Sequence, residues 1–331
     1  MKIRYVQSSE INQILPMKNA IDCLRKSFFE AKDTKMILPA RGVFELDTHK
    51  GNFGVVMPAY VSGVGFGVKI STVMPHNPKG FGLSLVNGLY VMFDNETGEP
   101  KIIMNGSSLT NLRTGAIGGL SIDILSLHES KILSVIGAGI QAGYQIEACL
   151  AVRGITQINI YSKTEKKSIS LKNYISNVLN FKGEIIVANS IDEAVVQADI
   201  VIMATSTGSE IPLLVNSSLK DHCHICAIGG RTLKAREVDS HILSECSIFV
   251  DDTNACLNES REIQDLVTTG VRELKEIVQL QDLVHFSENE LIDIKKRRTF
   301  FRSVGIPLQD ISIASQLLKL LPQDVEKTFE L

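Results

Sequence analysis

The residues in the middle of the chain that could bind a phosphate-containing ligand are Gly137, Gly139 and Ala142. They follow an apolar run at 132–136 and precede a stretch at 143–152 that is typical of a helix. In a strand–turn–helix unit, the first glycine allows a tight turn and the second lets backbone N–H groups approach a pyrophosphate. The small third residue lets the helix pack closely on the strand. A dinucleotide site, with its phosphates at the helix N-terminus, is therefore predicted at Gly137-Ala138-Gly139-Ile140-Gln141-Ala142. A glycine turn of purely structural use is the alternative.

The end of the next predicted strand, at 157–161, indicates which dinucleotide is bound. An NAD site usually has Asp or Glu there, which accepts a hydrogen bond from the ribose 2′-hydroxyl. Here the chain continues with Ser162, Lys163 and Thr164, so no carboxylate occupies the tip. These donors would form charge-assisted hydrogen bonds with a 2′-phosphate. The sequence therefore predicts NADP(H) in preference to NAD(H), although the lysines here could simply solvate the start of a helix.

Three cations before the glycine motif, Arg41, Lys69 and Arg113, stand among apolar or small neighbours. Burying a cation costs free energy unless an anion meets it. Each of the three could form a structural ion pair, or it could meet the carboxylate of a ligand. The spacing alone leaves both interpretations open.

Two patterns of secondary structure must position these residues. The first part of the chain has helical periodicity over 8–33, followed by short strand-like runs typical of an α+β unit with an antiparallel sheet. These runs lie at 53–58, 65–71, 86–93 and 101–104. After a helix predicted over 109–127, strands and helices alternate, which predicts a parallel sheet with right-handed crossovers. Its expected strands lie at 131–136, 157–161, 184–188, 200–204, 224–228 and 247–250, and a last helix is expected over 304–321.

We therefore predict an α/β protein with a doubly wound parallel Rossmann sheet, inserted in a second α+β domain. The expected boundaries are 113–302 for the dinucleotide-binding domain and 1–112 with 303–331 for the other. Ligands bind beyond the carboxyl ends of parallel strands. This rule places Thr205 and Ser206 at the binding edge, together with the loop Gly229-Gly230-Arg231-Thr232.

Composition restricts the class of partner. The chain has 331 residues and a net charge of −3, with no basic block longer than Lys295–Arg298, so we expect no nucleic-acid partner. No apolar stretch reaches the ~20 residues that span a bilayer, and the first residues do not resemble a signal peptide. Six scattered cysteines are typical of a reduced compartment. We expect a cytoplasmic protein without membrane contact. We also expect no metal site, because Cys223-His224-Ile225-Cys226 has no second ligand pair at zinc-like spacing.

Over nearly its whole length the chain resembles the ornithine cyclodeaminase/μ-crystallin family. The matching segments are Met57-Pro58-Ala59-Tyr60, Gly67-Val68-Lys69, His76-Asn77-Pro78, Phe93–Pro100, Leu109–Ala116, Ile136–Ala142, Arg236-Glu237-Val238-Asp239 and Ser303–Asp310. Matches in this order across two domains are specific for the family, and much less specific for the reaction.

The resemblance implies a homodimer in which the first unit and the C-terminal helix bind substrate and form the dimer. It implies that Arg41, Lys69 and Arg113 hold the carboxylate of an amino or imino acid. Lys69 is the best candidate for a general acid, provided that burial and the arginines lower its pKa. The residues implied to contact the cofactor include Thr114, beside Arg113, and the turn Ser303-Val304-Gly305 against the nicotinamide.

The chain departs from the members that cyclise ornithine at three positions. Arg231 stands where they carry an Asp, and Leu85 and Val55 stand where they carry Thr and Glu. A cation repels the ammonium group of ornithine, and apolar side chains do not solvate it. We therefore expect Arg231 to meet a second carboxylate of the substrate.

The function predicted from the sequence is an NAD(P)H-dependent oxidoreductase that acts on the C=N or C–N bond of a small imino or amino acid. It would be a ketimine or cyclic imine reductase, or an amino-acid dehydrogenase. Two alternatives stay open. One is an ornithine or lysine cyclodeaminase, a lyase that keeps NAD bound and releases ammonia. The other is a non-catalytic NADPH-dependent binding protein of the μ-crystallin kind.

Overall fold

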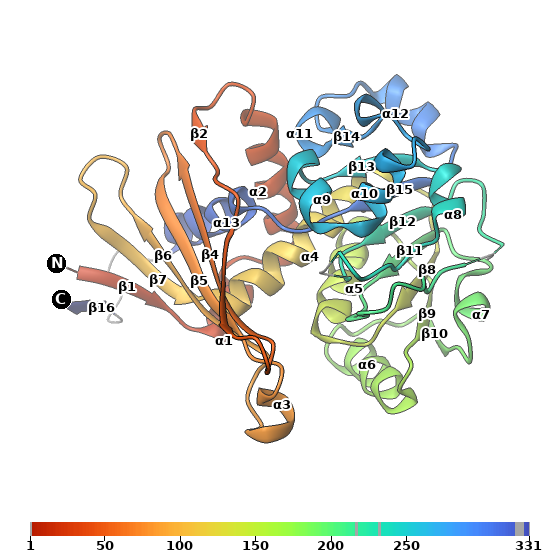
Figure 1. Cartoon of the computed structure of the whole chain (residues 1–331), viewed down its shortest axis with the longest axis horizontal. Helices are drawn as coiled ribbons and strands as arrows, with labels where there is room; N and C mark the ends of the chain where they lie inside the picture. The colour runs from red at the N-terminus through yellow and green to blue at the C-terminus, as the bar shows by residue number, and fades with distance from the viewer. Residues whose placement is uncertain (1, 216–217, 231–232, 322–327, 331) are drawn as a thin grey trace. The chain divides into compact units, whose positions relative to one another are not determined.

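The computed structural model describes residues 2–215, 218–230, 233–321 and 328–330 (Figure 1). The chain forms two compact units: Met1–Arg113 with Ile306–Leu331, and Thr114–Gly305. Helix α4 (Gly106–Leu125) contributes residues to both units. None of the helices in the described part of the chain is long and apolar enough to span a membrane.

The first unit is built on a mixed eight-stranded sheet. Its strands run in the order β16-β1-β7-β6-β5-β4-β2, and β3 also pairs with β4. All neighbours are antiparallel except β1 and β7. The strands are β1 (Lys2–Val6), β2 (Met36–Ile37), β3 (Gly42–Asp47), β4 (Asn52–Val61), β5 (Gly65–Val73), β6 (Val86–Phe93), β7 (Pro100–Asn105) and β16 (Thr328–Glu330). The helices of this unit are α1 (Ser8–Ile14), α2 (Met17–Glu30), α3 (Asn77–Gly80) and α13 (Pro307–Leu320).

One face of this sheet is covered by α13, which packs on β4, β5 and β6, and α2 packs on α13 (Figure 1). Side chains alternate between the two faces of a strand. Met57, Lys69, Tyr90 and Met104 therefore form one row across the covered face, because the register pairs them in turn. All four are buried.

The other face of the same sheet is apolar and open. Phe66, Ile70 and Leu89 alternate with the buried positions of β5 and β6, and they are 42%, 52% and 54% exposed. The register pairs Ile70 with Leu89, and Phe66 with Phe93. This open apolar face is defined here by Phe66, Ile70 and Leu89.

Two predicted helices of this unit differ from those observed, and proline explains both differences. The helix expected over 8–33 is split into α1 and α2, because Pro16 has no N–H to donate and precedes the first turn of α2. The helix expected from 304 begins at Pro307, a position where proline is well tolerated. Strands β1 and β3 were not predicted.

The second unit is an eight-stranded parallel sheet in the order β10-β9-β8-β11-β12-β15-β13-β14. The strands are β8 (Ile132–Ile136), β9 (Gln157–Tyr161), β10 (Glu184–Val187), β11 (Ile200–Met203), β12 (His224–Ala227), β13 (Ser247–Val250), β14 (Val278–Gln279) and β15 (Thr299–Arg302). The strand order reverses direction between β8 and β11. The predicted α/β class with a doubly wound parallel sheet is therefore confirmed.

The helices of the second unit alternate with these strands. They are α5 (Ile140–Val152), α6 (Glu165–Asn177), α7 (Ile191–Val195), α8 (Ser240–Ser244), α9 (Thr253–Glu259), α10 (Arg261–Thr268), α11 (Leu280–Leu283) and α12 (Glu288–Lys295), with a 3-10 turn at Leu274–Glu276. Helix α5 packs on β8 and α6, and α6 packs on β9 and β10.

Strands β14 and β15 of this sheet were not predicted from the sequence, and β15 matters for the binding edge. Strand β15 inserts between β12 and β13, and all four of its residues are buried. Its insertion brings Arg302 and the turn that follows it to the carboxyl edge of the sheet.

Strand β12 contains the segment that superficially resembled a metal motif. His224 is buried, with Nδ1 2.8 Å from Thr299 Oγ1 and Nε2 3.3 Å from Ser121 Oγ. Burial lowers the pKa of His224 to about 3, so the imidazole is neutral. Among the described residues there is no group of three His, Cys, Asp or Glu side chains that could hold a metal ion.

Candidate active site

Two of the predicted substrate-binding cations meet at one carboxylate in the first unit. Lys69 Nζ donates to Asp310 Oδ2 over 2.7 Å, and Arg113 Nε donates to Asp310 Oδ1 over 3.1 Å. Arg113 Nη1 also donates to Gln309 Oε1 over 2.9 Å. Strand β5, helix α4 and the first turn of α13 thus bring together residues that are more than 190 positions apart in the sequence.

This cluster of Lys69, Arg113 and Asp310 is buried and carries more positive than negative charge. Lys69 is 4% exposed, Arg113 7% and Asp310 0%. Two cations that share one carboxylate leave the trio with a net charge of +1. A buried charge needs a partner, and a ligand carboxylate would supply one. The sequence left open whether these cations form a structural ion pair or bind a ligand carboxylate. The same cluster is compatible with both interpretations.

The surroundings of Lys69 lower its pKa. Burial, together with the charges of Arg113 and Arg41, lowers the pKa of Lys69 to about 8 against the opposing effect of Asp310. These are the two conditions under which the sequence suggested Lys69 as a general acid. Arg41, half-buried just before β3, thus acts electrostatically on Lys69.

Tyr90 lies directly opposite Lys69 on β6 and was not singled out from the sequence. Its hydroxyl is buried, and it has no hydrogen-bond partner among the described residues. Burial raises the pKa of Tyr90, and the charge of Asp310 adds to that effect. Gly67 makes room for the ring, since a Cβ at residue 67 would lie 2.0 Å from the Tyr90 hydroxyl oxygen.

The glycine motif of the second unit has the geometry expected of a phosphate-binding turn. Gly137 follows β8 with φ +109°, and a Cβ there would lie 2.4 Å from the carbonyl oxygen of Ala204. Gly139 caps α5, and a Cβ there would meet nothing within 4 Å. Ala142 is fully buried in the first turn of α5. The turn therefore exposes backbone at a helix N-terminus, beside the point where the strand order reverses.

The other predicted cofactor residues of this unit follow strands of the same sheet. Because the strands are parallel, their carboxyl ends share one edge. At this edge Ser162-Lys163-Thr164 follow β9, Thr205 and Ser206 follow β11, and Ser303-Val304-Gly305 follow β15. Lys163, Thr164 and Ser206 are exposed. Arg231 lies outside the described residues.

Thr114 provides an independent indication that this unit holds a polar ligand. It lies on α4 and is 5% exposed, and its Oγ1 has no hydrogen-bond partner in the part of the chain that the structure describes. An unsatisfied buried hydroxyl costs about 1–3 kcal/mol. A bound phosphate would satisfy it, so Thr114 and the turn at Gly139 both fit a dinucleotide.

Two carboxylates that sequence reasoning did not select hold the loops of this edge in place. Asp251, after β13, accepts from Ser303 Oγ at 2.7 Å and from Gly305 N at 2.8 Å. Glu237 Oε1 accepts from Thr205 N at 2.9 Å and from Thr205 Oγ1 at 2.6 Å. Glu237 lies in a segment that matched the family, which was the available signal, but nothing in the segment itself indicates its partner.

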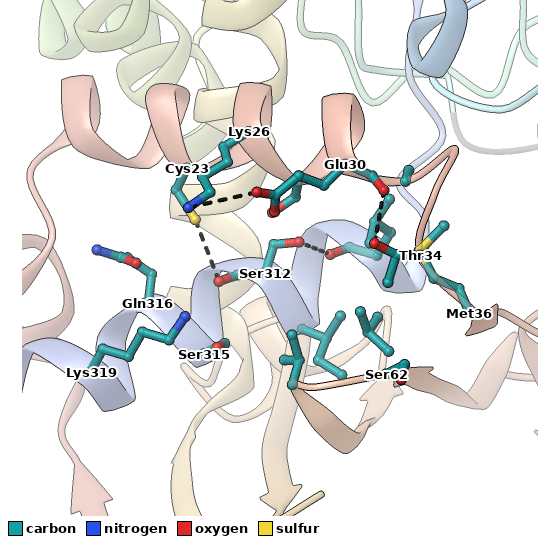
Figure 2. Close-up of a pocket in the computed structure, with 16 residues that line it drawn as sticks. Cys23, Lys26, Glu30, Thr34, Met36, Ser62, Ser312, Ser315, Gln316 and Lys319 are labelled. Carbon is teal, nitrogen blue, oxygen red and sulfur yellow. Dashed lines mark hydrogen bonds and ion pairs between the residues drawn. The ribbon is translucent and has the colours of Figure 1, made fainter.

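A cavity of about 170 Å³ in the first unit (Figure 2) has a lining that does not include Lys69, Arg113 or Asp310. It is lined by α2, the end of β4 and one stripe of α13 that includes Ser312, Ser315 and Lys319. With about 100° between successive residues of a helix, Asp310 lies on nearly the opposite side of α13. None of the buried side-chain atoms that lack a partner in the described structure belongs to this lining, so nothing there points to a ligand.

Comparison with known proteins is decisive about the family. The model of the ornithine cyclodeaminase/mu-crystallin family matches residues 2–321. The chain belongs to this family. The resemblance inferred from the matching segments is therefore confirmed.

Members of the family with named activities align with nearly the entire chain. A Δ1-pyrroline-2-carboxylate reductase from Bacillus cereus is 30% identical over 335 residues, which cover 98% of this chain and 99% of that protein. The structure of Thermococcus litoralis Δ1-pyrroline-2-carboxylate reductase, in complex with NADH and L-proline, is 29% identical with a TM-score of 0.87. It covers 96% of this chain and 97% of its own.

An archaeal alanine dehydrogenase, solved as a dimer with bound NAD, is 25% identical with a TM-score of 0.86. The alignment covers 100% of this chain and 99% of that one.

Proposed function

We propose that this protein is an NAD(P)H-dependent oxidoreductase that reduces the C=N bond of a small imino acid, or oxidises the corresponding amino acid. The observation that carries the proposal is the buried Lys69, Arg113 and Asp310 cluster, whose net charge of +1 suits one carboxylate. The dinucleotide fold of the second unit and the Δ1-pyrroline-2-carboxylate reductases among its relatives support the same reaction class.

Different residues of the chain would bind the substrate carboxylate and donate the proton in such a reaction. A nicotinamide bound in the second unit would supply the hydride for the imine carbon. The cluster would hold the substrate carboxylate, because Arg113 offers a planar guanidinium and Lys69 a point charge. Lys69 would donate the proton to the imine nitrogen, since a pKa of about 8 leaves it protonated yet easily deprotonated at neutral pH. Orienting the substrate in this way can lower the barrier by about 7–11 kcal/mol.

Three side chains favour imine reduction over ornithine cyclisation. Val55 is buried and Leu85 is 43% exposed, and neither can solvate a side-chain ammonium group. The third is Arg231, which we propose meets a second carboxylate of the substrate.

The test is a panel assay with cyclic imines, ketimines formed from pyruvate and amines, and ornithine. Oxidation of the reduced cofactor is followed by absorbance, and ammonia is measured in parallel. We expect imine-dependent cofactor oxidation without release of ammonia. Ammonia from ornithine without net absorbance change would instead identify a cyclodeaminase, and ligand binding without any turnover would identify a binding protein.

Replacing the proposed acid separates catalysis from binding. Lys69→Met should lower imine turnover by about 10²–10⁴-fold and leave dinucleotide binding intact. Lys101→Met is the matched control, because Lys101 is also a strand lysine beside acids, at 3.5 Å from Glu99, but is exposed. Unchanged turnover of Lys69→Met would exclude the role proposed for Lys69.

For the cofactor we infer a preference for NADP(H) over NAD(H). Support comes from the tip of β9, where Ser162, Lys163 and Thr164 stand and no carboxylate does. The Thermococcus litoralis reductase was solved with NADH and the archaeal alanine dehydrogenase with NAD, so the preference for NADP(H) is argued only from side chains of this chain. The ratio of kcat/KM for the two cofactors tests it. Lys163→Glu should shift the ratio toward NADH, whereas Lys166→Glu, at the second residue of α6, should shift it much less.

We also propose that the protein is a homodimer through the open apolar face of the first unit. Monomers rarely expose contiguous apolar surface of this kind, and the alanine dehydrogenase relative was solved as a dimer. Ile70→Lys should therefore yield a monomer when mass is measured by light scattering after size exclusion. Ile292→Lys is the matched control, since both isoleucines are 52% exposed.

A cytoplasmic location is proposed from the thiols. None of the six cysteines forms a disulfide, and five of them are buried. Unpaired cysteines persist in reducing compartments. Fluorescence microscopy of the tagged full chain would test this location.

A further inference from the structure

The buried carboxylate of Glu237 stands at the meeting point of two loops at the binding edge of the second unit. One loop follows β11 and begins with Thr205, and the other is the glycine pair Gly229 and Gly230 after β12. The two loops are in direct contact, because Gly230 N donates to Thr205 O over 3.2 Å. A Cβ at residue 229 would lie 2.3 Å from Glu237 Oε1 and 2.3 Å from Thr205 O. Only glycine lets the loops close on the carboxylate.

Every oxygen of Glu237 is committed to this junction. Oε1 accepts both hydrogen bonds from Thr205, and Oε2 accepts from Arg302 Nη1 at 3.2 Å. Arg302 Nη2 in turn donates to the carbonyl of Gly230 over 2.7 Å. The main-chain oxygen of Glu237 accepts from Leu214 N at 2.9 Å. Glu237 therefore joins the start of one loop to the turn of the other, through its own oxygens and through Arg302.

A second acid makes the charge of this junction unusual. Glu262 Oε1 accepts from Glu237 N at 2.7 Å, and its Oε2 accepts from Ser260 Oγ at 2.9 Å. Glu237 is 0% exposed, Glu262 3% and Arg302 1%. Arg302 forms an ion pair with Glu237 at 3.2 Å, and the charge of Glu262 also acts on Arg302. The trio carries a net charge of −1 when both acids are ionised.

The surroundings of Glu237 determine when it holds a proton. Burial, with a smaller contribution from the charge of Glu262, raises the pKa of Glu237 to about 7 against the opposing effects of Arg302 and the hydrogen bonds from Thr205. Since the Thr205 bonds favour the ionised form, ionisation must strengthen those bonds in return. The other titratable groups around this junction are Cys226 on β12, Cys256 on α9 and Asp251 after β13.

We propose that Glu237 is a positioning residue for the dinucleotide. The ionised carboxylate of Glu237 fixes the loop at Thr205 against Gly229 and Gly230. Cofactor binding is therefore coupled to the loss of a proton from the Glu237 and Glu262 pair. This inference rests on the proposed function, since it takes the carboxyl edge of the sheet as the cofactor site. Protonation weakens the carboxylate as an acceptor, and the loop at Thr205 is then held less firmly.

The experiment measures dinucleotide binding to the full chain as a function of pH. The reduced nicotinamide of NADPH or NADH is itself fluorescent and reports binding, and the chain has no tryptophan that would add its own emission. For the wild type, the Kd should rise by up to about tenfold as the pH falls from 8 to 6. Tenfold is the limit because pH 6 lies one unit below the pKa of about 7, and one coupled proton changes the Kd at most tenfold per pH unit. For Glu237→Gln, the Kd should be raised at pH 8 and should not depend on pH beyond any titration of the dinucleotide itself.

Two further variants keep the proposal open to refutation if Glu237→Gln fails to fold, as judged by thermal melting. Glu262→Gln removes a neighbouring negative charge, so the midpoint of the pH dependence should move to lower pH. Thr205→Val removes one of the two bonds to Glu237 and should raise the Kd at pH 8. Glu129→Gln is the control, because Glu129 is exposed, and its binding curve should match that of the wild type.

The outcomes separate this inference from the proposed function. Wild-type affinity and pH dependence in Glu237→Gln would overturn the inference while the function stands, and so would an unmoved midpoint in Glu262→Gln. Failure of the wild type to bind either dinucleotide would overturn the proposed function, and the inference with it.

Discussion

The two buried ionic clusters of this molecule have opposite charge balance. In the first unit, Lys69 and Arg113 share the single carboxylate of Asp310. In the second unit, Glu237 pairs with the guanidinium of Arg302, and the charge of Glu262 acts on the same guanidinium. The first cluster can be neutralised by an anionic ligand, whereas the second can be neutralised by a proton. The charge that remains uncompensated, positive in the first cluster and negative in the second, is what distinguishes them.

The largest loss of stability is expected when the excess positive charge of the first cluster is increased. Asp310→Asn leaves two buried cations without their carboxylate, and breaking a buried pair costs about 3–5 kcal/mol. Urea denaturation should show this loss of stability at neutral pH. Asp293→Asn is the matched control, because Asp293 pairs with Lys296 at 2.9 Å on the surface, and it should show no measurable loss. Equal losses in the two variants would contradict the comparison.

A second prediction concerns the pH dependence that the first cluster imposes. A general acid must be protonated, so the rate of imine reduction should fall as pH rises through about 8, the pKa of Lys69. Arg41→Gln removes a charge that lowers this pKa, so the falling limb should move to higher pH. Initial rates between pH 6 and 10 at saturating cofactor would show both effects. A limb that stays in place in Arg41→Gln would assign the titration to another group.

The same pKa fixes the sign of the effect on stability. Lys69 titrates at about 8 in the folded chain and at 10.5 when unperturbed. Between these values the unfolded state binds more protons, so this lysine makes stability rise with pH across the interval.

The smallest change in stability is expected when the excess negative charge of the second cluster is removed. Glu262→Gln leaves one carboxylate for one guanidinium, and its amide oxygen can still accept from Glu237 N. The loss of stability at pH 8 should therefore stay below about 1 kcal/mol, the usual value of one neutral hydrogen bond, or become a gain. The same urea titration measures it. A loss as large as that of Asp310→Asn would show that charge balance does not decide the cost.

The sequence predicted the fold class because periodicity is a local signal. Alternating strands and helices after residue 131 indicated the parallel sheet, and the glycine turn after β8 indicated its binding edge. Strand β15 was not predicted, because four residues, Thr299–Arg302, directly after a basic run do not show a clear period. Strand β1 was missed for a similar reason. Its apolar residues Ile3 and Tyr5 alternate with basic neighbours, so the segment resembles mixed polar sequence.

For the candidate site, the sequence could flag cations in apolar surroundings but not the acids that meet them. Asp310 lies in the first turn of α13, where an acid is explained by the helix dipole alone. Its partners Lys69 and Arg113 are 241 and 197 residues away. Glu237 is likewise separated from Thr205 and Arg302 by 32 and 65 residues. Pairings of this range depend on the tertiary fold, and a single sequence does not contain them.

The contact between Gly67 and Tyr90 has a consequence for how this sequence can diverge. Any side chain at residue 67 would occupy the space of the Tyr90 hydroxyl, since even a Cβ would lie 2.0 Å from it. A descendant that acquires alanine or a larger residue at 67 needs the Tyr90 ring to shift or to be replaced, so glycine at 67 lets tyrosine keep its present position beside Lys69. Among aligned relatives, this pair of positions should covary.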